Sequence, residues 1–360
     1  MKVKYYKNFI EDYRPSMDQY AQQLIDYQKN YFKNIDISSY QPTLSSISRF
    51  IPSDIWKLRY SRYISYPYQS KKLLKHDIAH ICDQQYAHLY PYLNSKLKFI
   101  TVNDLNPIVF QEKLSHNPKL IKFSLKSLKF FTKVFAISSN TKKDIVKFTD
   151  CPEEKIEVIM RAIEPFFNND SIDNKITAKK YNIPANKKKI LISGNAHYKN
   201  NFTSYKILER LIELNQNIVL IHVGSNNYKN NISLKLENNI IRIPFIEREE
   251  LPSIYKLADI LLFPSIYEGF GLPILESMSC GTPVVCSNNS SIPELVADAA
   301  LTSDHDDVSS FTKNILNLFS NNELYKKMID KGLSRSKLFS INKFHHKLID
   351  IYKDELNKLR

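Results

Sequence analysis

The sequence predicts an α/β protein built from two doubly wound parallel sheets, and three observations favour this fold class. Short apolar strands recur along the chain, and each ends in polar residues ahead of an amphipathic helix. Parallel sheets that are covered on both faces have this pattern. A polar segment, Asn168–Lys175, interrupts the pattern, which then starts again. The length of 360 residues suits two domains, each with its own core.

The first domain is expected to span residues 1–170. Pro15 and Ser16 open a helix, because Ser16-Met17-Asp18-Gln19 has the spacing of a capping box. Residues 30–75 are aromatic and basic. We expect them to form loops and helices that line an acceptor cleft, rest on a membrane surface or simply cover the sheet. Five strands are predicted, at Lys2–Tyr6, Asp77–Asp83, Leu97–Val102, Val134–Ile137 and Ile156–Ile159.

Polar side chains stand where the strands of the first domain end. His80 and Asp83 end one strand, Asn103 and Asp104 end the next, and Ser138 ends a third. Because the ligands of parallel sheets gather at the carboxyl ends of the strands, these residues would share one rim.

The second domain is expected to span residues 171–340, and residues 341–360 to form a helix that crosses back to the first domain. Ser291-Ile292-Pro293-Glu294 has the spacing of a second capping box. Helices are predicted near 203–214, 248–258, 272–279, 291–297, 308–318 and 322–337. Strands are predicted at Ile190–Ser193, Ile218–Val223, Ile240–Ile243, Ile260–Phe263 and Pro283–Ser287.

The composition limits the compartment and the partners. A net charge of +14 fits nucleic acid, an anionic membrane surface or small polyanions such as nucleotide sugars, and a codon-biased genome would give a similar excess of lysine. No nucleic-acid-binding motif is present. No apolar run suits a membrane span or a signal peptide, so a cytoplasmic protein is expected. The four cysteines lack CxxC spacing, which predicts neither a zinc site nor a disulfide framework.

One stretch, residues 265–285, combines features that suit an anionic ligand. A loop after an apolar strand carries Glu268, and Gly269 and Gly271 let its backbone turn sharply and approach a ligand closely. Pro273 stands where a helix would begin, and Glu276 falls in the first turn of that helix. The free N–H groups at such a helix start form an anion site. All six glycines stand at position 194 or later, so the second half of the chain is the better place for a diphosphate that is bound by closely approaching backbone.

The same stretch resembles the signature of glycosyltransferase family 4, whose members are retaining enzymes of the GT-B fold. The resemblance rests on Glu268-Gly269-Phe270-Gly271-Leu272-Pro273-Ile274-Leu275-Glu276, with seven residues between the two glutamates. The flanking segments at 258–265, 280–285 and 291–294 are also similar to the family, and weaker similarities cover most of the chain. The resemblance implies two Rossmann-like domains with a donor/acceptor cleft between them.

The resemblance also implies roles for residues of the second domain. Glu276 would hold the two ribose hydroxyls of a nucleotide, and Glu268 would contact the hydroxyls of the donor sugar. The backbone at Gly269, Phe270, Gly271 and Leu272 would face the sugar or the diphosphate.

Two departures from the family concern the charges around the reaction. Lys199 matches a lysine that neutralises the diphosphate, whereas Asn195 stands where the family usually has an arginine. Leaving-group stabilisation would then rest more on Lys199 and the helix start, or Arg161 would substitute.

The second departure lies in the first domain, on the acceptor side, where Ser16, Asn103 and Asp104 match family segments. Asn103 replaces a common histidine, and an asparagine does not shuttle protons. His80 or Asp83 would therefore supply any proton transfer.

These residues predict an enzyme that moves a hexose, of mannose or glucose type, from a GDP- or UDP-hexose to a growing saccharide. The acceptor would be lipid-linked, as in O-antigen or another cell-surface polysaccharide, and the basic first domain would rest on the inner face of the membrane. A soluble transferase for a small-molecule acceptor and a non-catalytic nucleotide- or carbohydrate-binding subunit are the alternatives. Asp304-His305-Asp306 contains an Asp-X-Asp, which we interpret as a loop and helix cap, so no metal is expected.

Overall fold

The computed structural model describes residues 1–12, 14–110, 118–168, 174–224 and 233–360. The chain forms two compact units. Unit 1 comprises Met1–Met160 and Asn342–Arg360, and unit 2 comprises Arg161–Ile341. The sequence had predicted domain boundaries after residues 170 and 340, whereas the units divide after Met160 and after Ile341. None of the helices within the described ranges is long and apolar enough to span a membrane.

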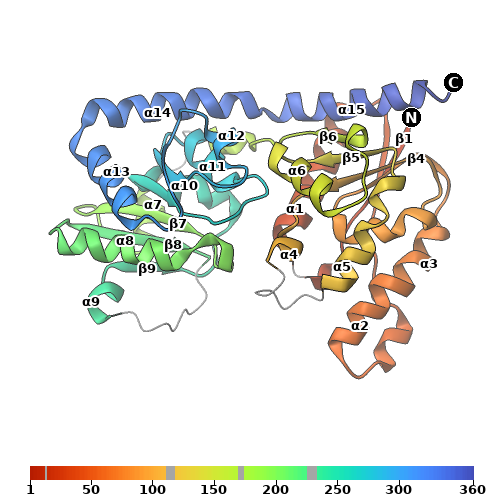
Figure 1. The fold of residues 1–360 in the computed structure, drawn as a ribbon, viewed down its shortest axis with the longest axis horizontal. Helices are drawn as coiled ribbons and strands as arrows, with labels where there is room; N and C mark the ends of the chain where they lie inside the picture. Colours follow the sequence, from red (N-terminus) through yellow and green to blue (C-terminus); the bar gives the residue numbers. More distant parts are fainter. Residues whose placement is uncertain (13, 111–117, 169–173, 225–232) are drawn as a thin grey trace. The chain divides into compact units, whose positions relative to one another are not determined.

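Unit 1 is built on a six-stranded parallel sheet in the order β2-β1-β3-β4-β5-β6 (Figure 1). In its register, Val3 of β1 pairs with Ile37 on one side and with Ile78 on the other. Strand β2 corrects the expectation that residues 30–75 form only loops and helices. The strands are β1 (Lys2–Tyr6), β2 (Asp36–Tyr40), β3 (His76–Ile81), β4 (Ser95–Val102), β5 (Lys133–Ala136) and β6 (Ile156–Val158).

Helices cover both faces of this sheet. The α-helices are α1 (Pro15–Tyr31), α2 (Asp54–Tyr60), α3 (Tyr66–Lys71), α4 (Asn106–Val109), α5 (Pro118–Leu125), α6 (Ser139–Phe148) and α15 (Ile341–Asn357). Shorter helical segments used below are η2 (Ser46–Phe50), η3 (Ser61–Ser65), η4 (Gln84–Tyr92) and η5 (Leu128–Phe130).

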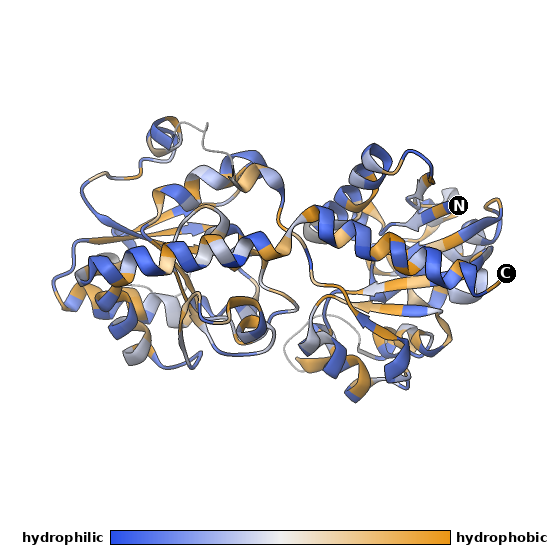
Figure 2. Ribbon diagram, turned by 90° about the horizontal axis from the view of Figure 1, so that it is seen from above, coloured by the Kyte–Doolittle hydropathy of each residue, from blue (hydrophilic) through white to orange (hydrophobic). Residues whose placement is uncertain are grey.

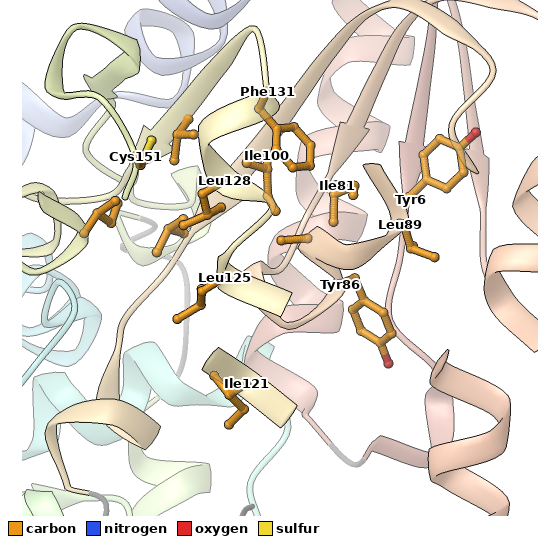
Figure 3. Close-up of a cluster of buried hydrophobic side chains, with 14 of the residues drawn as sticks. Tyr6, Ile81, Tyr86, Leu89, Ile100, Ile121, Leu125, Leu128, Phe131 and Cys151 are labelled. Atoms are coloured by element: carbon orange, nitrogen blue, oxygen red, sulfur yellow. The ribbon is translucent and has the colours of Figure 1, made fainter. Parts of the chain in front are cut away.

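The core of unit 1 has two layers because side chains alternate along each strand. On one face, Ile81 and Ile100 pack against Leu89, Leu125 and Phe131 (Figure 3). On the other face, Val3, Tyr5 and Ile78 pack with residues of α1 and of α15, notably Leu24, Leu348 and Tyr352. Figure 2 shows the alternation of polar and apolar residues along the C-terminal helix that this packing requires.

Unit 2 repeats the architecture with a parallel sheet in the order β12-β11-β10-β7-β8-β9. The predicted strands are present, and β12 is an additional edge strand. The strands are β7 (Lys188–Ser193), β8 (Ile218–Val223), β9 (Ile240–Ile243), β10 (Ile260–Phe263), β11 (Val284–Ser287) and β12 (Leu301–Ser303). The helices are α7 (Asn174–Lys180), α8 (Asn201–Glu213), α9 (Leu234–Glu237), α10 (Leu251–Leu257), α11 (Leu272–Ser279), α12 (Ile292–Val296), α13 (Val308–Ser320) and α14 (Asn322–Ser336).

Candidate active site

The loop between β10 and α11 brings Glu268 to Lys199. Glu268 is only 7% exposed, and its Oε1 lies 2.8 Å from the Lys199 Nζ. The ammonium group also lies 4.7 Å from the centre of the Phe263 ring. Two residues that the sequence proposed separately therefore form one buried ion pair at the carboxyl edge of the sheet.

Gly194 makes room for Lys199. Its φ is +90°, a conformation that residues with a Cβ rarely adopt, and an added Cβ would lie 3.3 Å from the Lys199 Cε. The Gly194 carbonyl accepts a hydrogen bond from the Asn201 side chain at 2.8 Å. The end of β7 is thereby fixed while the lysine stem packs closely against it.

Asn195 joins the ends of two neighbouring strands. Its side-chain amide donates a hydrogen bond to the Gly224 carbonyl, directly after β8. Its Oδ1 is buried and has no hydrogen-bond partner among the described residues. The amide thus supplies no positive charge where the family usually has an arginine.

Gly271 begins α11 with a left-handed backbone. Its φ is +104°, and an added Cβ would lie 3.1 Å from the Leu295 Cδ2. The preceding loop is held by two serines. The Ser290 Oγ accepts from the Glu268 N–H at 2.8 Å, and the Ser291 hydroxyl lies 3.0 Å from the Glu268 carbonyl oxygen and 3.1 Å from that of Phe270. This corrects the capping-box prediction, because Ser291 makes no side-chain cap for α12 and supports the Glu268 loop instead.

Glu276 is the fifth residue of α11 and not in its first turn as predicted, and it is held by two donors. Its Oε1 is 2.7 Å from an Arg248 guanidinium nitrogen, and its Oε2 accepts from the Tyr255 hydroxyl at 2.8 Å. The carboxylate is 3% exposed. Its orientation is therefore fixed by groups from the segment after β9 and from α10.

Arg248 bridges Glu276 to a second carboxylate. Its Nε donates to the Glu164 Oε2 at 2.6 Å, and its guanidinium lies 5.0 Å from the centre of the Phe167 ring. Burial alone would lower the pKa of Arg248, but the carboxylates of Glu276 and Glu164 raise it overall, so the guanidinium stays charged. Burial, together with the Glu276 carboxylate, raises the pKa of Tyr255 well above its usual value, so the hydroxyl remains a donor.

Sequence reasoning missed the partners of Glu276. The available signal was the position of Arg248 shortly after the apolar strand Ile240–Ile243. Nothing in the sequence linked Arg248 to Glu164, which is distant along the chain.

In unit 1, the structure argues against a proton-transfer role for His80. The side chain is fully buried, with Nε2 2.8 Å from the Thr101 Oγ1 and Nδ1 hydrogen-bonded to the Tyr352 hydroxyl of α15. Burial lowers the pKa of His80 to about 3, so the imidazole is neutral at physiological pH. Its contacts tie α15 to β3, which is a structural function.

Asp83 is also enclosed. It is fully buried and accepts hydrogen bonds from the Gln85 N–H at 2.8 Å and the Asn8 amide at 2.9 Å, and Arg14 lies 3.3 Å away. The first of these bonds caps η4. These contacts satisfy the carboxylate within unit 1, so we leave Asp83 out of the chemical step.

The other first-domain candidates occupy the ends of strands or helices. The Asn103 amide donates to the Cys82 carbonyl at 3.2 Å, and Asp104 accepts from the Asn106 N–H at 3.0 Å. Thus the ends of β3 and β4 do meet through Asn103. Ser16 lies in the first turn of α1, and its side chain is outside the described part of the structure. Arg161, the first residue of unit 2, is 8% exposed.

The Asp-X-Asp segment serves as a loop and a cap. Asp307 accepts from the Ser310 N–H at 2.9 Å and caps α13, as predicted. Asp304 accepts from the Asn288 amide at 2.9 Å. Within the described ranges, no group of three or more His, Cys, Asp or Glu residues is arranged to hold a metal ion.

Comparisons with known proteins agree with the resemblance. Residues 173–335 match the family model of the glycosyl transferases group 1. The O-antigen chain mannosyltransferase B of Escherichia coli is 43% identical over 109 residues, which are 30% of this chain and 29% of that protein. The O-antigen chain mannosyltransferase RfbU of Salmonella typhimurium is 27% identical over 239 residues, which are 64% of this chain and 63% of that protein. The chain thus spans less than two thirds of the length of either relative.

Solved structures match the whole chain and confirm the GT-B fold. WaaG, a glycosyltransferase involved in lipopolysaccharide biosynthesis, has a TM-score of 0.74 at 13% identity, covering 98% of this chain and 99% of that one. Anabaena HepE in complex with UDP-glucose has a TM-score of 0.74 at 14% identity, covering 98% and 100% of the two chains.

Proposed function

Because residues 173–335 match the family model of the glycosyl transferases group 1, we propose that this protein is a retaining glycosyltransferase. It would move a hexose from a nucleotide sugar to a growing, lipid-linked saccharide of the cell surface. The proposal rests on two ion pairs in unit 2. Lys199 pairs with Glu268, and Arg248 pairs with Glu276. The Lys199 ammonium group suits a diphosphate, and the carboxylates of Glu268 and Glu276 suit the hydroxyls of a sugar and of a ribose.

The leaving diphosphate would be stabilised by Lys199 and by the start of α11. Breaking the sugar–phosphate bond places negative charge on the diphosphate. The Lys199 side chain is 14% exposed, so its charge is poorly screened by water. The N–H groups at the start of α11 would contribute the positive end of the helix dipole. Because Asn195 brings no charge, this protein would depend on Lys199 more than a relative with an arginine there.

Glu276 would accept the two ribose hydroxyls. A carboxylate has about four acceptor positions, and Arg248 and Tyr255 occupy one position on each oxygen. Each oxygen therefore retains capacity for one hydroxyl. Glu268, held by Lys199, would contact the hydroxyls of the donor sugar.

The acceptor's proton would go to the leaving phosphate. The structure encloses His80 and Asp83 in unit 1, which leaves neither as a suitable base. Proton transfer to the departing phosphate is compatible with retention at the anomeric carbon and requires no side chain to change its charge.

The sugar proposed first is mannose, because the relatives named above are mannosyltransferases. UDP-glucose is the second donor to examine, since HepE is described in complex with it. The basic charge of the chain, +14, supports a cytoplasmic protein that contacts the anionic inner face of the membrane, where a lipid-linked acceptor would be presented.

A non-catalytic nucleotide- or carbohydrate-binding subunit is the second candidate, favoured by Asn195 and Asn103 in place of the family's charged or titratable residues. A panel of GDP- and UDP-hexoses, incubated with lipid-linked saccharides and with soluble sugar acceptors, separates the possibilities. Release of nucleoside diphosphate that requires a lipid-linked acceptor supports the proposal. Release with soluble acceptors alone indicates the small-molecule transferase, and tight nucleotide binding without release indicates the subunit.

The ribose assignment has its own test, Glu276→Gln. This change removes a charge-assisted acceptor worth about 1.5–3 kcal/mol, so donor affinity should fall about 10- to 100-fold. Glu250→Gln is the matched control, because Glu250 is an acid of the same unit that pairs with Lys180 at 2.7 Å. Titration calorimetry with the donor measures both variants. An unchanged affinity in Glu276→Gln would show that the carboxylate does not hold the ribose.

A further inference from the structure

An aromatic and basic surface on unit 1 has no role in the site described above. It comprises the apolar side chains of Phe50 at the end of η2, Ile55 and Trp56 on α2, and Ile64 on η3, together with Arg49 of η2 and Arg59 of α2. Phe50 is 87% exposed, Ile55 64%, Trp56 60% and Ile64 58%. No residue of α2 is buried. In Figure 1, α2 lies well away from the strands of the unit 1 sheet. Because α2 leaves an isoleucine and a tryptophan exposed, we infer that this surface binds a partner outside the chain.

A pocket of about 600 Å³ opens in this surface. Trp56, Tyr60 and Ile64 line it together with Leu120 of α5, and Arg59 is the charged residue of the lining. The Arg59 guanidinium lies 5.0 Å from the centre of the Trp56 ring. A pocket with apolar walls and one cation beside it suits a hydrocarbon chain attached to an anionic headgroup.

The segment that forms most of the pocket is basic. Residues 46–75 contain seven Lys or Arg and one acid, Asp54. Asp54 pairs with Lys57 at 2.9 Å and Arg62 pairs with Asp12, whereas Arg49 is exposed and Arg59 lines the pocket. Exposed rings next to exposed cations are the combination that binds the headgroup region of an anionic bilayer, since the rings enter the interface and the cations meet the phosphates.

We propose that this surface docks unit 1 on a bilayer of anionic phospholipid. Trp56 and Phe50 enter the headgroup region, and one lipid hydrocarbon chain occupies the pocket. Arg49 and Arg59 contact lipid phosphates. This inference names the surface for the membrane contact in the proposed function and rests on that function for its biological sense. Its test needs neither donor nor acceptor.

Trp56 is the single tryptophan of the chain, so its fluorescence reports this surface alone. The full chain is mixed with vesicles of phosphatidylcholine containing about 30% phosphatidylglycerol, with and without bromine on the acyl chains. We expect a blue shift of the Trp56 emission and quenching by the brominated lipid. Both should weaken as salt is raised and should be absent with pure phosphatidylcholine.

The variant Phe50→Ser should lower the affinity for these vesicles about tenfold, because it removes an exposed ring from the docking surface. Phe130→Ser is the matched control. Phe130 is 54% exposed in unit 1 and has Lys129 5.4 Å from its ring centre, yet it lies outside the surface. Equal thermal unfolding midpoints in both variants would show that each folds.

Several outcomes would overturn the inference. They are an unquenched Trp56, equal losses of affinity in Phe50→Ser and Phe130→Ser, and equal binding to neutral vesicles. Quenching only by a brominated polyprenyl phosphate would assign the pocket to the acceptor's tail, and a blue shift that depends on protein concentration without vesicles would assign it to a second copy. Hexosyl transfer by a protein that does not bind vesicles would overturn the docking inference and leave the proposed transferase activity standing.

Discussion

Arg248 is the residue whose contacts most change the interpretation of the site. It lies between Glu276 and Glu164 and contacts the Phe167 ring, so it orients Glu276 rather than contacting a reacting atom. A guanidinium reaches two carboxylates at once because its donors form a planar fork, which an ammonium group does not reproduce.

We therefore predict that Arg248→Lys raises the donor KM about tenfold and changes kcat much less, since binding of the ribose is affected and the chemical step is not. Steady-state kinetics measure the two constants. Arg242→Lys is the control, because Arg242 forks onto Glu237 at 2.8 and 2.9 Å outside the site. A fall in kcat with an unchanged KM would contradict the positioning function.

Burial lowers the pKa of four histidines of unit 1, His76, His80, His88 and His345, which makes the stability of the unit depend on pH. Burial lowers the pKa of His80 and of His345 to about 3, whereas both would titrate near 6.5 in the unfolded chain. Between these values the unfolded state binds more protons than the folded state. The contribution of the neutral histidines is thus fully present above pH 6.5 and is lost as the pH falls toward 3.

The free energy of unfolding should therefore decrease as the pH falls from 6.5 toward 3. Each histidine contributes a slope of up to ~1.4 kcal/mol per pH unit. His80→Gln, which does not titrate, should show a shallower slope in urea unfolding. Parallel pH profiles for wild type and His80→Gln would contradict this account.

At the scale of single residues, the sequence predicts those site residues that lie within a local motif. Glu268, Glu276 and Gly271 follow from one short stretch, and Lys199 follows from its match to a family lysine. His80 was proposed because it lies near the end of a strand. Its burial depends on Tyr352 and Thr101, which only the folded chain brings to it. Arg248 escaped notice for the same reason, since its importance comes from two carboxylates distant in the sequence.

Helix α15 covers one face of the unit 1 sheet, although its residues lie far from those strands in the sequence. Its buried residues, His345, Leu348, Ile349 and Tyr352, recur at the spacing of one helical face. They join the core on the face of the sheet that α1 also covers. The helix is thus a structural layer of unit 1, although it follows unit 2 in the chain.

Leu348→Ala should consequently destabilise unit 1 by about 2–5 kcal/mol, because it removes a side chain that is 1% exposed. Lys353→Ala is the control, since its side chain is 51% exposed and lies 3.9 Å from Asp350. Chemical denaturation of the full chain, followed by a signal from unit 1, measures both. Similar small effects in the two variants would mean that α15 is not part of that core.

The elements that the sequence missed are edge strands. Strand β10 is a continuous apolar run and β8 is interrupted only by His222, because both faces of a parallel sheet are covered, and the predicted bounds of both strands agree with the structure. Strand β2 reads Asp-Ile-Ser-Ser-Tyr and buries only Ile37, and β12 has three residues. An edge strand that is short or half exposed carries too few apolar residues to stand out from a loop.

At the scale of the whole molecule, the two units differ in what the sequence reveals. Unit 2 contains the local signature, and its candidate donor residues meet in pairs at one edge of its sheet. Unit 1 retains the fold, but its candidate residues are engaged in capping and packing. The acceptor and the linkage depend on pocket shape, which no short motif encodes. The charge of +14 is a property of the molecule as a whole. The sequence shows that residues 30–75 are basic, but which of their rings and cations are exposed became evident only from the structure.

The central claim is that this protein transfers a hexose from a nucleotide sugar and that Lys199 stabilises the leaving diphosphate. Mass spectrometry of a lipid-linked acceptor, incubated with GDP-mannose or UDP-glucose and either wild type or Lys199→Met, tests it most directly. The account predicts an acceptor heavier by one hexose with wild type and a rate lower by at least about 100-fold with Lys199→Met. An acceptor of unchanged mass with every donor, or equal transfer by Lys199→Met, would contradict it.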